Sequence, residues 1–90
     1  MVLYRKTFYI GVKPRTGISK RINIETLMNA EKILEKKYST TRNDHIINAD
    51  TQKVRYLIHG TYVENKENYI EIQHETKAGL TAMIRELELE

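Results

Sequence analysis

The sequence contains no cysteine, no tryptophan and a single proline among its 90 residues. Without cysteine the chain can form neither a disulfide framework nor a thiolate zinc site, so its fold must rest on a hydrophobic core. No stretch approaches the roughly 20 apolar residues that a membrane span needs, and the first residues lack the apolar run of a signal peptide. We therefore expect a cytoplasmic protein with no membrane partner.

Glycine and histidine are few and scattered. Gly11, Gly17, Gly60 and Gly79 are isolated from one another, so the chain lacks the glycine-rich loop that cradles phosphates. The three histidines are scattered, and neither a cysteine nor a nucleophile accompanies them. Metal sites need closely spaced ligands, and an active site needs its catalytic groups together. We therefore expect no enzymatic activity, no metal site and no cofactor.

The first half of the chain has the periodicity of two strands followed by a helix. Phe8, Ile10 and Val12 lie at alternate positions, the turn-forming residues 13–17 follow, and alternation resumes at Ile18. This pattern predicts a β-hairpin. Helical spacing of apolar residues over 25–38, with Asn23 as N-cap, predicts a helix. Residues 39–52 are polar apart from a pair of isoleucines, and we expect a connecting loop there with one short element at most.

The second half repeats the same order. Alternation over 54–62 and around Ile70 and Ile72 predicts a second hairpin, and from Thr76 onward apolar residues at helical spacing predict a second helix. The sequence therefore predicts one α+β domain over residues 1–90, built from ββα units at 1–38 and 53–90 that are joined by the loop 39–52. Its sheet is expected to be four-stranded and antiparallel, with both helices packed on one face.

Charge is distributed unevenly. The chain has a net charge of +3 and a pI of about 9.2, but residues 1–45 carry ten Lys and Arg against four Asp and Glu, whereas residues 46–90 carry five against eight. In the predicted N-terminal hairpin the cations alternate with aromatic residues, and cations neutralise phosphates while aromatic rings stack on bases. The candidate nucleic-acid-binding residues are Arg5, Lys6, Tyr9, Lys13, Arg15, Lys20 and Arg21.

The C-terminal pattern has a counterpart in a known family. The ββα order ending in Glu75-Thr76-Lys77-Ala78, with a helix from Leu80 to Leu87, resembles the small arm-binding domains of phage-type integrases. The resemblance covers each half of the chain separately and rests on element order without a diagnostic motif. It implies strands that are presented to DNA and braced by one helix.

Two functions fit these observations. The first is a small non-enzymatic accessory protein of a phage or mobile element that binds DNA or RNA through the basic aromatic hairpin. The second is a protein–protein interaction module, an inhibitor or adaptor of a larger enzyme, whose partner contacts the acidic C-terminal half. The open edges of a small sheet would also allow a homodimer.

Overall fold

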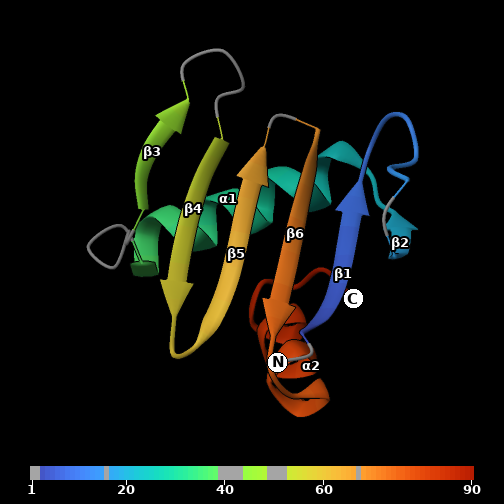
Figure 1. Cartoon of the computed structure of the whole chain (residues 1–90). Helices are drawn as coiled ribbons and strands as arrows, with labels where there is room; N and C mark the ends of the chain where they lie inside the picture. Colours follow the sequence, from blue (N-terminus) through green and yellow to red (C-terminus); the bar gives the residue numbers. More distant parts are fainter. Residues whose placement is uncertain (1–2, 16, 39–43, 49–52, 67) are drawn as a thin grey trace.

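The computed structural model describes residues 3–15, 17–38, 44–48, 53–66 and 68–90. Within these ranges the chain forms strands and helices in α+β order, as predicted (Figure 1). The elements are β1 (Tyr4–Tyr9), β2 (Ile18–Arg21), α1 (Ile24–Tyr38), β3 (Asp44–Asn48), β4 (Lys53–Ile58), β5 (Thr61–Lys66), β6 (Tyr69–His74) and α2 (Lys77–Glu86).

Both predicted helices form where local signals place them. At the start of α1 the side chain of Asn23 accepts a hydrogen bond from the backbone N–H of Thr26 at 2.8 Å, which confirms it as the N-cap. At the start of α2 the hydroxyl of Thr76 accepts from the N–H of Gly79 at 3.0 Å. Each cap satisfies one of the amide groups that a first helical turn leaves without a partner.

The sheet differs from the predicted one. Within the described residues it has six strands in the order β2-β1-β6-β5-β4-β3, and it is mixed. The expected N-terminal hairpin is wrong, because β1 and β2 pair in parallel, with Lys6 opposite Ile18 and Tyr9 opposite Arg21. Alternation reports which face a side chain occupies but not the direction of the strand. After Tyr9 the N–H of Ile10 bonds to the carbonyl of Asn68 instead of to a returning strand, and β2 begins at Ile18 beside Lys6.

The second half contains one strand more than predicted. His59 and Gly60 have φ values of 48° and 81°, the left-handed pair of a type I′ turn, and this turn divides the expected strand 54–62 into β4 and β5. The expected turn residues 64–66 are the last three of β5. β3 lies inside the expected loop 39–52 and pairs with β4 at the far edge of the sheet. The unit over 53–90 is therefore βββα rather than ββα.

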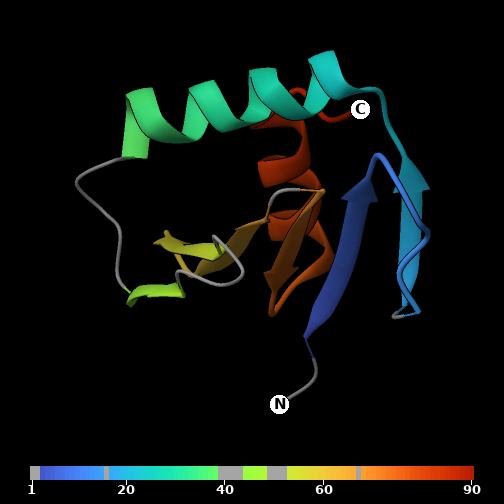
Figure 2. The same ribbon diagram turned by 90° about the horizontal axis from the view of Figure 1, so that it is seen from above.

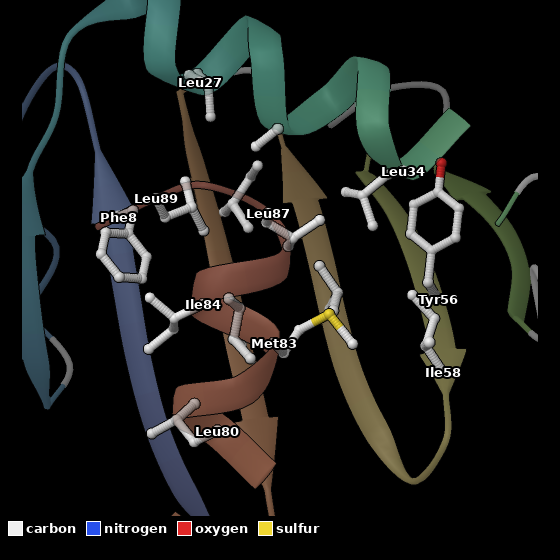
Figure 3. Close-up of a cluster of buried hydrophobic side chains, with 14 residues drawn as sticks. Phe8, Leu27, Leu34, Tyr56, Ile58, Leu80, Met83, Ile84, Leu87 and Leu89 are labelled. Carbon is white, nitrogen blue, oxygen red and sulfur yellow. The ribbon is translucent and has the colours of Figure 1, made fainter. Parts of the chain in front are cut away.

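The hydrophobic core lies between the sheet and the two helices. Figure 2 shows α1 and α2 on the same side of the strands, with α2 between α1 and the sheet. Phe8, Ile70, Ile72 and Val63 are fully buried on the sheet side, and Figure 3 shows side chains of α2 and the residues after it filling the space between the sheet and α1. This face is called the covered face below.

Candidate functional site

The face of the sheet opposite the core brings together side chains from both halves of the chain. Figure 1 looks onto it, with α1 crossing behind the strands. Successive residues of a strand point to opposite faces, so burial of Phe8 and Ile70 on the covered face places their neighbours Tyr9 and Tyr69 on the other one. Among the described residues no helix lies over that face, which is called the open face below.

Four residues form a line across the open face at the end where β1 stops and β6 begins. Strand register places Arg21 beside Tyr9, Tyr9 beside Tyr69, and Tyr69 beside Lys66. The guanidinium carbon of Arg21 lies 5.1 Å from the centre of the Tyr9 ring, and the ammonium of Lys66 lies 5.6 Å from the centre of the Tyr69 ring. These four residues are called the aromatic row, and they combine two cations with two rings and no carboxylate.

A second line runs parallel to the aromatic row, two residues along each strand. Register places Ser19 beside Thr7, Thr7 beside Glu71, and Glu71 beside Glu64. The hydroxyl of Thr7 donates to Glu71 Oε2 at 3.1 Å, and the amide of Gln73 donates to Glu71 Oε1 at 2.6 Å. These contacts fix the orientation of a carboxylate that is 9% exposed. Ser19, Thr7, Glu71 and Glu64 are called the carboxylate row.

The structure brings three of the seven predicted site residues onto the open face. Arg21 and Tyr9 belong to the aromatic row, and Arg5 lies two residues beyond Thr7, opposite Gln73. Arg5 and Arg21 are exposed, whereas Tyr9 is 8% exposed and packs beneath Arg21. Two more predicted residues, Lys13 and Arg15, are exposed in the connection between β1 and β2.

The remaining two predicted residues lie away from the open face and contact Glu90 instead. Lys6 and Lys20 alternate with the open-face residues, so they lie on the covered side at the β2 edge. Lys6 forms an ion pair with the carboxylate of Glu90, and the ammonium of Lys20 lies 3.8 Å from the same carboxylate. The hydrogen bond from Lys6 holds the pKa of Glu90 below its usual value. These lysines tie the C-terminal segment to β1 and β2.

Tyr69 and Lys66 were not among the predicted site residues. The turn at His59 and Gly60 ends β4 and lets β5 begin at Thr61, so that β5 extends to Lys66, which pairs with Tyr69 of β6. A His-Gly pair between two alternating runs was the sequence signal for it, because glycine accepts a positive φ without steric cost. A glycine inside a strand is also typical of a β-bulge. If Gly60 formed a bulge in one long strand, residues 64–68 would be the turn of the hairpin, and Lys66 would not lie beside Tyr69.

A second feature lies on α1, away from the open face. A hollow of about 390 Å³ is lined by Lys32, Lys36, Lys37, Asn29, Ile33 and Glu88. Its cations are exposed side chains of one helix, and Glu88 opposes their charge. Among the described residues no group of three or more His, Cys, Asp or Glu is placed to hold a metal ion. The helices that the structure describes are also too short or too polar to cross a membrane.

Comparison of the chain with protein-family models, curated proteins and solved structures yields no match. The resemblance to integrase arm-binding domains therefore has no support beyond element order, and the parallel pairing of β1 with β2 departs from the hairpin on which it depended.

Proposed function

We propose that this protein binds nucleic acid on the open face of its sheet. The observation that carries the proposal is the aromatic row, in which Arg21 and Lys66 flank Tyr9 and Tyr69 on a surface that no described helix covers. Cations that neutralise phosphates, placed beside rings that stack on bases, are the two components of sequence-tolerant nucleic-acid binding. The row crosses four strands, which at a strand spacing of about 4.8 Å makes it roughly 14 Å long.

The distribution of charge around the row supports the same function. Lys13 and Arg15 extend the positive surface beyond β1, and Arg5 adds a cation farther along the same strand. Two acidic residues of the C-terminal half contact other side chains of the molecule. Glu90 pairs with Lys6 and Lys20, and Glu86 accepts a hydrogen bond from Tyr38. The cations exposed near the aromatic row, on β1, on β2 or in the connection between them, include four of the ten in residues 1–45: Arg5, Lys13, Arg15 and Arg21.

The test is a salt titration of binding to labelled nucleic acid, followed by fluorescence anisotropy. The double variant Arg21→Gln/Lys66→Gln removes both cations of the aromatic row. Lys32→Gln/Lys36→Gln is its matched control, because it removes the same charge from the exposed face of α1. We expect the row variant to lose roughly tenfold in affinity per cation, and the slope of log affinity against log salt to fall by about 1.4 for a single strand or about 1.8 for a duplex. Equal losses in both variants would show that binding depends on net charge alone.

One observation favours the alternative, an interaction between protein surfaces. In the part of the chain that the structure describes, no strand pairs with the outer edge of β2, and Val12, Ile18 and Ile24 near it are 93%, 67% and 58% exposed. Such an edge can pair with the same strand of a second copy to form a homodimer. Light scattering over a range of concentrations tests this. A dimer that Ile18→Lys dissociates would support it, and a monomer at every concentration would exclude it.

A further inference from the structure

The rings of the aromatic row are accessible only to unpaired bases. Tyr69 is half-buried, whereas Tyr9 is 8% exposed. In a duplex the faces of the bases are stacked on one another, and only their edges reach the grooves. A side chain on a sheet surface can therefore stack on a base only when that base is unpaired, and Tyr69 is the ring that offers the larger surface.

The carboxylate row sets the direction in which a bound strand lies. Glu71 and Glu64 are directly opposite each other, two residues along the strands from Tyr69 and Lys66. Phosphates are repelled by the Glu71 carboxylate, which accepts hydrogen bonds from the neutral side chains of Thr7 and Gln73, and are attracted by Arg21 and Lys66. The backbone of a bound strand therefore follows the cations at the end of the sheet, and its bases point along the sheet surface toward Glu71.

The carboxylate of Glu71 is oriented to accept a hydrogen bond from a base that reaches it. Thr7 and Gln73 each donate to one of its two oxygens, which fixes the carboxylate and leaves each oxygen with further acceptor capacity. A carboxylate accepts hydrogen bonds from the amino group of cytosine, whereas uracil and thymine carry an acceptor oxygen at the same position. Among pyrimidines, cytosine is thus the base that Glu71 favours.

We infer that the open face binds single-stranded nucleic acid and prefers cytosine to uracil or thymine, with Glu71 accepting the amino group of the base. This inference rests on the proposed function, because it specifies the ligand of the same site. The preference between two pyrimidines isolates hydrogen bonding to the base edge, since their phosphates are identical and their rings stack over similar areas.

The experiment compares single-stranded cytidine and uridine homopolymers of equal length with a duplex of that length, for the wild type, Glu71→Gln and Glu75→Gln. Glu75 is exposed between β6 and α2, so its substitution removes the same charge outside the row. We expect the wild type and Glu75→Gln to prefer cytidine by about fivefold or more, and Glu71→Gln to bind both homopolymers equally. The ratio compares two ligands of one protein, so partial unfolding of a variant cancels.

The outcomes separate this inference from the function on which it rests. A duplex bound as tightly as either single strand would overturn the single-strand assignment. Single strands bound without preference, or a preference that survives in Glu71→Gln, would overturn the role of Glu71 while the proposed function stands. If neither single strands nor duplex bind at low salt, the proposed function itself fails.

Discussion

The two faces of the sheet are built from alternate residues of the same strands, yet their chemistry is opposite. Along β6, Ile70 and Ile72 are fully buried against the helices, whereas Tyr69, Glu71 and Gln73 lie on the open face. The covered face is apolar because burial of such side chains stabilises the fold. The open face carries rings, cations and a hydrogen-bonded carboxylate. One face thus supplies stability, and we propose that the other supplies binding.

The largest effect expected from this division is on stability, at the covered face. Ile72→Ala removes a fully buried side chain between Lys6 and Val63, and we expect it to lower the free energy of unfolding by about 2–5 kcal/mol. Gln73→Ala, one residue along on the open face, removes one hydrogen bond to Glu71 and should cost about 1 kcal/mol. Urea denaturation measures both, and equal losses would contradict the division.

The next largest effect on stability is expected at the connection between β6 and α2. The imidazole of His74 accepts from the N–H of Thr76 at 2.8 Å and lies where a Cβ on Gly79 would be. We expect Gly79→Ala to destabilise the protein by about 1–3 kcal/mol, because the methyl group would overlap the ring. Adding His74→Ala removes the overlap, so the double variant should lose less than the two single variants together. Additive losses would mean that the ring and the glycine act independently.

Tyr38 provides a pH-dependent test of the covered side. Its hydroxyl donates to Glu86 and so joins the ends of α1 and α2, and burial, with this hydrogen bond and the nearby Glu86 charge, raises its pKa from 10 to about 12. The folded state therefore favours the protonated tyrosine. Its contribution is fully present below pH 10 and is lost as the pH rises toward 12, because the unfolded chain releases the proton first.

The variant Tyr38→Phe measures that contribution. At neutral pH we expect it to be less stable than the wild type by about 1 kcal/mol, the usual value of a lost hydrogen bond. The difference should shrink between pH 10 and 12, while titration of the lysines, common to both proteins, cancels. A difference that stays constant over this pH range would show that Glu86 is not the partner that matters.

The smallest effect is a gain in stability in the turn that follows α2. Glu88 has a φ of 56°, and the N–H of Leu89 bonds back to the carbonyl of Ile84, the pattern in which helices prefer glycine at this position. Glu88→Gly should raise the free energy of unfolding by roughly 0.5–1 kcal/mol, since it relieves the left-handed strain but loosens the unfolded chain. It should leave nucleic-acid affinity unchanged, because Glu88 is far from the open face. Thermal unfolding and anisotropy check the two parts.

The helices were predictable because their signals are local. Asn23 and Thr76 cap them, and the apolar spacing that follows is that of one helical face. The relative direction of β1 and β2 was not predictable, because apolar and polar residues alternate in the same way in parallel and in antiparallel strands. The position of Lys20 was the sequence signal against a hairpin. In a hairpin it opposes Ile10 on the core side, whereas in the parallel register it lies at the sheet edge and reaches Glu90.

The candidate site was only partly predictable for a related reason. Arg5, Tyr9 and Arg21 could be selected because each lies in a basic, aromatic stretch of the sequence. Their partners Tyr69 and Lys66 come from the opposite end of the chain, and only the register of β6 against β1 and β5 brings them together. Separating them from the lysines that bind Glu90 likewise required knowing which face each residue occupies.

The central claim, that the open face binds and the covered side stabilises, is tested most directly by mapping a bound oligonucleotide. Amide chemical shifts would be followed by NMR during titration with a single-stranded cytidine homopolymer. We predict the largest changes at Tyr9, Arg21, Lys66, Tyr69 and Glu71, with little change along α1. Changes that centre on Lys32, Lys36 and Lys37, around the hollow on α1, would contradict the account.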